Sequence, residues 1–586
     1  RQSLDATTAD RMFRRFDDIF ETCGWRVLTL KHGRMQREVF RRPGGEAIAA
    51  WIDACPNADY AALTYQGGAA WRARLTADLA ADPKALALIA GFDDDALSAL
   101  MLNLGGHCIE TLIDAFAAAD DDRPTLFIAY TVKGYGLPFQ GHKDNHAGLM
   151  NPSQIAELRR AMGIAEGEEW APFGGLGHNA VAALETFVAP FRTSLARTDR
   201  SASAIPVPPR LAVPEGRQQA TQTAFGKILL DLSRSGHPLA DRLVTTSPDV
   251  TVSTNLGPFV NQRGLFRRQE CRDVFAGAKI PSPQKWEGHE AGQHLELGIA
   301  ENNLFLALAA LGLSAPLFGE RLLPIGTVYD PFIARGLDAL NYACYQDARF
   351  LLVATPSGIT LGPEGGAHQS VGTPLIGMGQ PGLTYFEPAY ADELAVIMRW
   401  AFAHMQEPDG GSVYLRLTTR AIEQAERRDA AWQDGALAGG YWLREPAPGS
   451  PFALVFTGAV APEVLAACDA LGEDMPGIGV LNVTSPDLLH RGWSAARAAR
   501  WHGAAAEGAH VDRLLGRLGS DARLVTVIDG SPAALSWLGA VRGQAVIPLG
   551  IDSFGQTGDL PALYRKYRLD AEAIVEAVVE HLLRSA

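Results

Sequence analysis

The chain has 586 residues, of which 47% are hydrophobic and 20% are charged, and at roughly 100 to 200 residues per domain we expect about three domains. This composition excludes a disordered, collagen-like or coiled-coil protein. With 52 Lys and Arg against 66 Asp and Glu, the net charge of −14 repels phosphate backbones and argues against a nucleic-acid or anionic-membrane binder.

The six cysteines are scattered and form no CxxC pair, which is typical of a reduced cytoplasmic protein. The chain begins Arg1-Gln2 without an initiator Met or a signal pattern, and we interpret this as a start in mid-fold. The longest strongly apolar run, Leu304–Phe318, has about 15 residues, fewer than the roughly 20 needed to span a bilayer. We therefore expect a buried core helix there and no membrane partner.

The first region, residues 1–165, alternates helical patterns with apolar runs. Runs at 25–30 and 124–132 predict strands, and the second is almost continuously apolar, as in a buried parallel strand that feeds a loop. Asn151 precedes an amphipathic pattern over 154–162, which predicts a capped helix.

A Gly-rich and Pro-rich interval, residues 166–215, follows and predicts an extended linker, because proline restricts its own backbone and that of its neighbour. Two further regions, 216–430 and 445–586, alternate apolar runs with helical patterns, which predicts βαβ units and parallel sheets. The expected fold class is α/β, with three doubly wound parallel or mixed-sheet domains. The predicted strands are 242–246, 350–354, 412–417, 452–458, 477–481 and 524–530, and the predicted helices include 304–313 and 391–405.

Ligands of such sheets bind in the loops that follow the strands, so the candidate functional residues lie just after the apolar runs. The loop after the second strand contains Lys133, His142 and His146, which could shuttle a proton or hold an anion. A solvated polar loop is the alternative at about even odds. Glu301 precedes the apolar run of the second region and is either an ordinary carboxylate at a helix N-terminus or, if buried, a carboxyl group that can share a proton.

Two more segments follow strands in the second region. The Gly-rich segment 362–370 contains Glu364 and His368, although a lone histidine in a turn is usually an ordinary surface residue. Tyr329 and Phe332 follow another predicted strand, where core packing is the more common role of aromatic rings. No one of these segments points to a particular function by itself, but their joint occurrence in this order along the chain is much more specific.

Together these segments resemble the thiamine-diphosphate-dependent transketolase superfamily, and most closely the homodimeric decarboxylase (first) component of the pyruvate dehydrogenase complex and related 2-oxoacid dehydrogenases. The match runs over essentially the whole chain and looks gapless from Glu301 to Phe332. It implies thiamine diphosphate and magnesium as cofactors. The implied domains are a remnant of the diphosphate-binding domain at 1–165, a linker at 166–215, a pyrimidine-binding domain at 216–430 and a transketolase C-terminal-like domain at 445–586.

The resemblance also implies roles for the candidate residues. Glu301 would hydrogen-bond a ring nitrogen of the cofactor's aminopyrimidine and stabilise its imino tautomer, and Phe332 would stack on that ring. Tyr329 would donate a hydrogen bond to the reacting group. Glu364 and His368 would hold the substrate carboxylate or donate a proton.

The remaining roles concern the loop and the metal. His146 lies where the family has a mobile catalytic loop and would close over the site, and the resemblance groups Lys133, His142 and Asp249 with the cofactor-binding residues. The Gly-Asp-Gly…Asn motif of the family, which carries the main Asp and Asn ligands to magnesium, is absent from this sequence. Only Gln2 would remain to offer its backbone carbonyl to the metal.

The implied function is oxidative decarboxylation of a small 2-oxoacid, with acyl transfer to the lipoyl acyltransferase component of a multienzyme complex, by a cytoplasmic homodimer. An Asp-Glu pair of pyruvate dehydrogenases is Asp249-Val250 here, and a lysine of their loop is Leu149, so pyruvate and 2-oxobutanoate both stay open as substrates. A transketolase is one alternative, in which the Arg-rich stretch 263–272 would hold a substrate phosphate. A non-catalytic or split-subunit partner is the other, favoured by the missing metal motif.

Overall fold

The computed structural model of the protein describes residues 13–195, 202–503 and 508–585. It divides into two compact units, residues 1–196 and 197–586, and the boundary falls inside the interval predicted to be a linker. None of the helices in the described ranges is long and apolar enough to cross a membrane.

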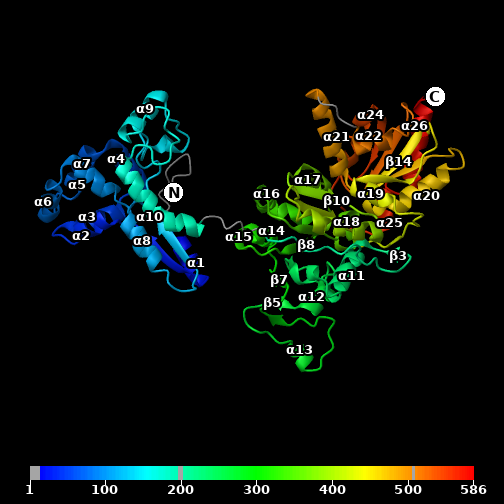
Figure 1. Cartoon of the computed structure of the whole chain (residues 1–586), viewed down its shortest axis with the longest axis horizontal. Helices are drawn as coiled ribbons and strands as arrows, with labels where there is room; N and C mark the ends of the chain where they lie inside the picture. The colour runs from blue at the N-terminus through cyan, green and yellow to red at the C-terminus, as the bar shows by residue number, and fades with distance from the viewer. Residues whose placement is uncertain (1–12, 196–201, 504–507, 586) are drawn as a thin grey trace. The chain divides into compact units, whose positions relative to one another are not determined.

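Unit 1 is mainly helical (Figure 1). Its core surrounds Trp71, which is fully buried and makes edge-to-face ring contacts with Trp51 and Tyr60, an arrangement that aromatic pairs favour. Strands β1 (Arg26–Leu30) and β2 (Thr125–Ala129) form a two-stranded parallel sheet. The helices are α1 (Phe13–Thr22), α2 (Arg34–Phe40), α3 (Gly45–Ala54), α4 (Asn57–Gln66), α5 (Gly68–Asp78), α6 (Pro83–Ala90), α7 (Asp94–Leu102), α8 (Ile109–Ala117), α9 (Pro152–Ala161) and α10 (His178–Leu195), with the 3-10 turns η1 (Gly105–His107) and η2 (Lys143–His146).

Two predictions for unit 1 need correction. β2 is parallel as predicted but only half-buried, because β1 is its one neighbouring strand in the described sheet. The interval 166–215 is not extended throughout, since α10 occupies 18 of its residues; this stretch is rich in Ala, Leu and other helix formers between the Gly-rich and Pro-rich parts. The capped helix is confirmed as α9, in which the Asn151 side chain accepts a hydrogen bond from the Gln154 N–H at 2.9 Å.

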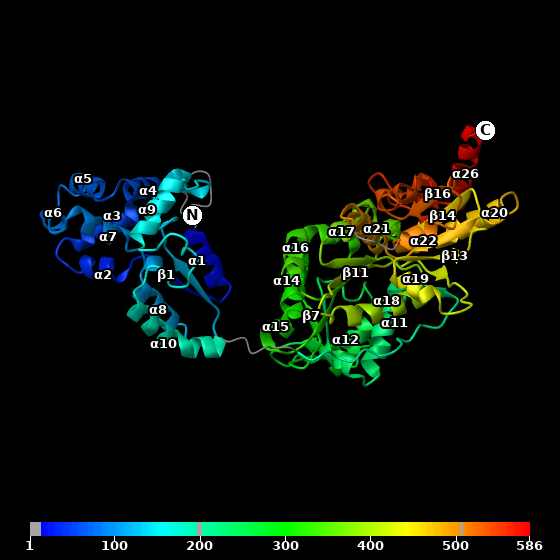
Figure 2. The same ribbon diagram turned by 45° about the horizontal axis from the view of Figure 1, so that its top comes forward.

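The larger sheet of unit 2 has eight strands in the order β10-β11-β9-β8-β4-β7-β5-β6, and every neighbouring pair is parallel. Both faces carry helices (Figure 2), as expected for a doubly wound fold. In β9, for example, Val353 packs with the core of α11, α12 and α18, whereas Leu352 packs with the core of α14 and α16. The strands are β4 (Leu243–Ser247), β5 (Leu265–Phe266), β6 (Gly288–His289), β7 (His294–Glu296), β8 (Leu323–Val328), β9 (Leu351–Ala354), β10 (Leu383–Phe386) and β11 (Ser412–Arg416).

Helices, short 3-10 turns and one short antiparallel strand pair accompany this sheet. They are α11 (Thr221–Arg234), η3 (Pro238–Arg242), α12 (Gly257–Arg263), α13 (Val274–Gly277), α14 (Glu301–Gly312), α15 (Ser314–Phe318), η4 (Asp330–Gly336), α16 (Leu337–Tyr345), η5 (Gly358–Glu364), η6 (Gly366–His368), α17 (Thr373–Gly379) and α18 (Ala391–His404), together with the short antiparallel pair β3 (Gln218–Gln219) and β12 (Ile422–Glu423).

A second sheet of unit 2 has five strands in the order β13-β15-β14-β16-β17, with only β13 antiparallel. Neighbouring residues of β14 again face two cores: Phe456 packs with α20 and α26, and Val455 with α21 and α22. The elements are α19 (Trp432–Leu437), β13 (Gly440–Arg444), β14 (Phe452–Thr457), η7 (Gly458–Val460), α20 (Ala461–Leu471), β15 (Gly479–Val483), α21 (Pro486–Trp501), α22 (His510–Leu515), β16 (Arg523–Ile528), α23 (Ala533–Ser536), α24 (Gly539–Arg542), β17 (Ala545–Leu549), α25 (Leu560–Lys566) and α26 (Ala571–Ser585).

These sheets confirm the predicted α/β class and the predicted strands of unit 2. The apolar run Leu304–Phe318 was predicted to form one buried helix, and this prediction needs correction. The run forms two helices, α14 and α15, with a break after Gly312. Pro316 explains the break, because its ring clashes with the carbonyl four residues earlier in a continuous helix. One side of the run is also open to solvent, at Leu306 and Phe318 among others.

Because the strands of the larger sheet are parallel, their carboxyl ends lie along one edge. The segments that leave β4, β7, β8 and β9 all start there. This is the edge at which ligands of doubly wound sheets bind.

Candidate active site

Three predicted site residues form one aromatic cluster at the carboxyl edge of the larger sheet: Tyr329, directly after β8, Phe332 in η4, and His368 in η6. The rings of Tyr329 and Phe332 are nearly parallel with centroids 6.0 Å apart. The His368 ring meets Phe332 at 5.5 Å and Tyr329 at 6.3 Å, both edge to face. The structure therefore brings together residues from two loops that are separate in the sequence.

Glu301 joins this cluster through a residue that sequence reasoning missed. Its carboxylate, at the start of α14, is only 9% exposed and is ion-paired with the guanidinium of Arg335. The same guanidinium lies over the Phe332 ring, with its central carbon 3.8 Å from the ring centroid. Arg335 carried no signal in the sequence, because nothing local distinguishes it from an ordinary surface arginine.

The ring of His368 has an unused hydrogen-bonding atom. Its Nδ1 is buried and has no hydrogen-bond partner within the described part of the chain. Buried polar atoms are nearly always hydrogen-bonded, so an atom of this kind beside a carboxylate and two aromatic rings fits a planar, polar ligand. The carboxylate of Glu301 and the ring face of Phe332 fit an aminopyrimidine group, and the Nδ1 of His368 offers a polar atom to a ligand beside it.

A buried ionic network lies behind the cluster. Asp330 accepts hydrogen bonds from Tyr414 at 2.5 Å and from the Nε of Arg416 at 2.9 Å, and Arg416 also donates to Glu387 at 2.7 Å. Arg416 and Asp330 are 1% and 0% exposed. Burial raises the pKa of Glu387, and the nearby guanidinium of Arg416 opposes this effect.

This network fixes the two loops that carry the cluster. Asp330 lies two residues before Phe332, and it accepts a hydrogen bond from Ser370, which lies two residues after His368. Sequence analysis missed the network although one signal was present: Arg416 lies inside the run 412–417 that predicted a strand. A buried arginine in a strand requires an anionic partner.

Two other predicted site residues, Glu364 and Asp249, are exposed and have no ring contact with the cluster in the described part of the chain. Glu364 is exposed, and among the described residues it makes neither a hydrogen bond nor an ion pair. Asp249, in the turn after β4, is also exposed, and its N–H donates to Glu296 at 2.9 Å. Although burial opposes it, the neighbouring His294 and the Thr251 hydroxyl, which donates a hydrogen bond at 2.6 Å, lower the pKa of Glu296 to about 2.

The remaining predicted residues belong to unit 1, in the loop after β2. Lys133 contacts the Nδ1 of His146, and the side chain of Asn145 donates to the Lys133 backbone carbonyl. His142 accepts a hydrogen bond from the Asp144 N–H at 3.1 Å and lies edge to face with Tyr65. His146 itself is exposed.

The metal prediction rests on Gln2, which lies outside the described residues. Within the described ranges, no group of three or more His, Cys, Asp and Glu side chains could hold a metal ion. The described residues thus fit the pyrimidine part of the cofactor through Glu301 and Phe332, while a magnesium ligand set is not found among them.

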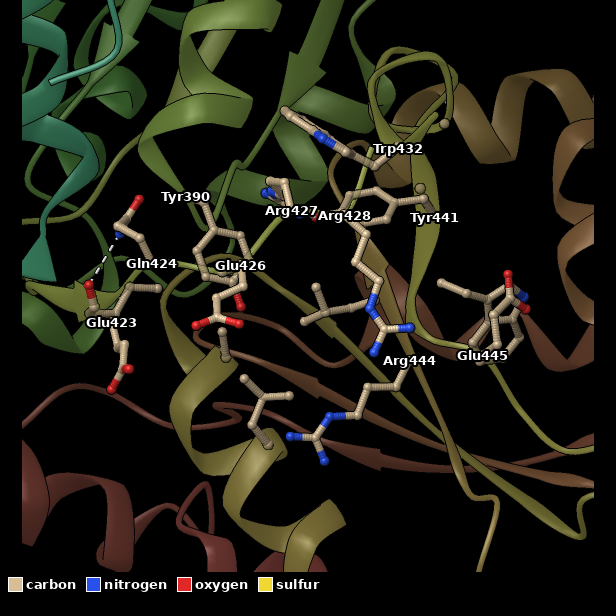
Figure 3. A pocket seen from close by; sticks show the side chains of 18 of the residues that line it. Tyr390, Glu423, Gln424, Glu426, Arg427, Arg428, Trp432, Tyr441, Arg444 and Glu445 are labelled. Carbon is tan, nitrogen blue, oxygen red and sulfur yellow. Dashed lines mark hydrogen bonds between the residues drawn. The ribbon is translucent and has the colours of Figure 1, made fainter. Parts of the chain in front are cut away.

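A cavity of about 1610 Å³ lies elsewhere in unit 2, between the segment 420–445 and helices α20 and α22, and none of the predicted site residues lines it. In Figure 3, Arg427 lies beside Trp432, whose ring is 4.1 Å from the guanidinium carbon. Arg427 is already ion-paired with Asp392 at 2.6 Å, so it does not offer a free charge to a ligand. Three further arginines of the cavity are paired in the same way: Arg420 with Glu463, Arg444 with Asp469 and Arg517 with Glu445.

Comparison with known proteins connects the aromatic cluster to a family. Residues 217–424 match the model of the transketolase pyrimidine-binding domain, and this range contains the whole cluster together with Glu301. The chain is 26% identical to the pyruvate dehydrogenase E1 component of Mycolicibacterium smegmatis, over 98% of this chain and 64% of that protein. It is 24% identical to the E1 component of Escherichia coli K12, over 100% of this chain and 67% of that protein.

The chain thus spans about two thirds of the length of these curated relatives. Among solved structures, the transketolase from Leishmania mexicana superposes with a TM-score of 0.56 at 18% identity, over 81% of this chain and 65% of that chain. At 18% identity, this structural similarity indicates a shared fold and carries no further conclusion about function.

Proposed function

We propose that this chain, a transketolase-superfamily protein close to the pyruvate dehydrogenase E1 component, acts in the thiamine-diphosphate-dependent decarboxylation of a small 2-oxoacid, pyruvate or 2-oxobutanoate. The observation that carries the proposal is the convergence of Glu301 with the cluster of Tyr329, Phe332 and His368. When bound, thiamine diphosphate would supply the nucleophilic carbon and the electron sink of the reaction.

In this proposal each residue acts through a contact that its position permits. Glu301, nearly buried at the start of α14, would hold a proton at a ring nitrogen of the pyrimidine, since a buried carboxyl group can act as acid and base. Phe332 would orient the ring by stacking, worth about 0.5 to 1.5 kcal/mol beyond its burial. His368 would use its unpartnered Nδ1 to bind the substrate carboxylate or to donate a proton, and Tyr329 would donate a hydrogen bond beside it.

The other predicted residues extend the same proposal. Glu364 would assist His368, and Asp249, Lys133 and His142 would contribute to cofactor binding. His146 would close over the site from its exposed loop. Magnesium would hold the diphosphate, with Gln2 contributing its backbone carbonyl.

The experiment is to assay decarboxylation by the intact gene product with thiamine diphosphate, magnesium and an artificial electron acceptor. Pyruvate, 2-oxobutanoate and branched 2-oxoacids are compared, and we expect turnover of one of them to be lost in Glu301→Gln. Glu320→Gln is the matched control, because Glu320 is an exposed carboxylate, paired with Arg242, in the same unit. Equal activity of both variants would contradict the role of Glu301.

Transketolase is the second candidate, since solved transketolases share the fold. It needs cationic groups for the phosphate of a sugar substrate. The Arg-rich stretch around β5 gives weak support, because Arg263 is already ion-paired with Asp241 at 2.8 Å. Ketol transfer from a sugar phosphate, without decarboxylation in the same preparation, would favour this candidate; failure of both assays would favour a non-catalytic or split-subunit partner.

We also propose a cytoplasmic homodimer that passes its acyl group to a lipoyl acyltransferase, with the domains 1–165, 216–430 and 445–586 assigned as above. Exposed apolar side chains on α14 and α16 support the dimer; they are Leu306 on α14 and, on α16, Tyr342 and Tyr345, the last 84% exposed. Light scattering should give twice the chain mass, and Tyr345→Glu should shift the protein towards the monomer. A wild-type monomer would contradict the proposal.

A further inference from the structure

Arg335 makes the two contacts that the proposed function assigns to the aminopyrimidine ring. Its guanidinium donates to the carboxylate of Glu301, which is the predicted partner of a pyrimidine nitrogen. It also covers the ring of Phe332, which is the predicted stacking partner, with a distance of 3.8 Å from the guanidinium carbon to the ring centroid. No other described cation contacts either group in the structure.

A guanidinium and an aminopyrimidine can make the same two contacts because their chemistry is similar. A guanidinium is planar, carries N–H donors in a fixed fork, binds carboxylates and stacks on aromatic faces. An aminopyrimidine is also planar, with an amino group that can donate and a ring that stacks. A site built from one carboxylate and one phenyl ring therefore accepts either group, but the contacts of the two overlap.

We propose that Arg335 is an internal competitor for the pyrimidine site, so that it occupies Glu301 and Phe332 until a cofactor pyrimidine displaces it. This inference rests on the proposed function and deepens it, because it names a residue that sets the affinity of the site. Arg335 would be a residue that regulates occupancy and would take no part in the chemical steps.

The position of Arg335 permits the exchange. Its side chain is 52% exposed, so the guanidinium can leave the site and become hydrated without a change in the core. The segments that carry Phe332 and His368 are held in place without Arg335, among other contacts by the hydrogen bond from Ser370 to Asp330. Displacement therefore removes one half-exposed ion pair and one cation–π contact, which are individually weak interactions.

The test is the affinity of the full chain for thiamine, which carries the aminopyrimidine without the diphosphate, measured by isothermal titration calorimetry. Arg335→Leu removes the competitor, and we expect thiamine to bind about 3- to 30-fold more tightly than to the wild type, the range given by the loss of the two contacts. Arg335→Lys keeps the charge but loses the planar fork, and we expect a smaller gain. Arg242→Leu, which breaks an exposed ion pair with Glu320 in the same unit, is the control and should leave the affinity unchanged.

Three outcomes would overturn the inference. Unchanged or weaker binding by Arg335→Leu, with binding still sensitive to Glu301→Gln, would show that Arg335 does not compete while the proposed function stands. Tighter binding in Arg335→Leu that Glu301→Gln does not reduce would remove Glu301 from the pyrimidine site, and the proposed function would fail with it. Absence of binding by the wild type and by Arg335→Leu would overturn both.

Discussion

The aromatic cluster of unit 2 and the histidine loop of unit 1 both follow strands, but they are held in different ways. Phe332 and His368 are anchored from behind by a fully buried ionic network, through Asp330 and Ser370. Most residues of the loop that carries His146 are exposed or half-buried, and its contacts include one within the loop, between Lys133 and His146, and ring contacts to Tyr65 of α4 and His107 of η1. A site that must present fixed groups is therefore tied to the core, whereas a loop with few buried contacts can move at little cost.

Asp330→Ala should have the largest effect, because it removes the anion from a buried ionic network and leaves the guanidinium of Arg416 poorly compensated. Breaking a buried pair typically costs about 3 to 5 kcal/mol. We expect a loss of this size in the urea unfolding transition of unit 2. Glu320→Ala, which breaks an exposed ion pair with Arg242, should cost no more than about 1 kcal/mol; equal losses in the two variants would mean that the network does not anchor the cluster.

The next prediction concerns Asp529, another buried carboxyl group, which lies against the first residues of η5. Asp529 is buried and accepts hydrogen bonds from the Ile359 N–H at 2.9 and 3.1 Å. Burial raises the pKa of Asp529 to about 6, against the opposing charge of Arg416. The folded state therefore binds this proton more tightly than the unfolded state, and the stabilisation is complete below the ordinary pKa and is lost as the pH rises through about 6.

The measurement is the difference in unfolding free energy between wild type and Asp529→Asn as a function of pH. Since each pKa unit corresponds to about 1.4 kcal/mol, the wild type should lose about 1 to 2 kcal/mol relative to the variant between about pH 5 and pH 7.5. Asparagine keeps an oxygen for the Ile359 N–H but does not titrate, so it isolates the contribution of Asp529. A pH-independent difference would contradict the raised pKa of Asp529.

These anchoring residues also show where prediction from the sequence ended. Glu301, Tyr329, Phe332 and His368 became candidates because each stands beside an apolar run, where parallel sheets place their ligands, but their roles came from the family resemblance and stay predictions. The pairing of Asp330 with Arg416 could not be predicted. The two residues are 86 positions apart in the sequence, and they meet only because of where β11 lies in the sheet.

The strand order decides which distant side chains meet. β11 lies between β10 and β9, which brings Arg416 close to Asp330 after β8 and to Glu387 after β10. Apolar runs predict strands but not the order of the strands in the sheet, so the elements were predictable from the sequence and this network was not. The same limit applies to Arg335, whose partner Glu301 lies 34 residues away.

The smallest effect is expected in the loop of unit 1. His146→Ala should change the free energy of unfolding by less than about 0.5 kcal/mol, because His146 is exposed and surface substitutions away from special features rarely exceed this value. If the proposed role is correct, the same variant should lower turnover in the decarboxylation assay while the affinity for thiamine stays unchanged. Lys143→Ala, an exposed neighbour in the same loop, is the control for both measurements.

Such a separation between stability and turnover would sharpen the contrast between the loop and the cluster. A residue held in a mobile loop can affect a reaction step without contributing to the fold, whereas Asp330 should affect both because its contacts belong to the core. If His146→Ala instead destabilised unit 1 by more than about 1 kcal/mol, its contact with Lys133 would be structural. The loop would then be a fixed part of unit 1, and the proposed closure over the site would lose its physical basis.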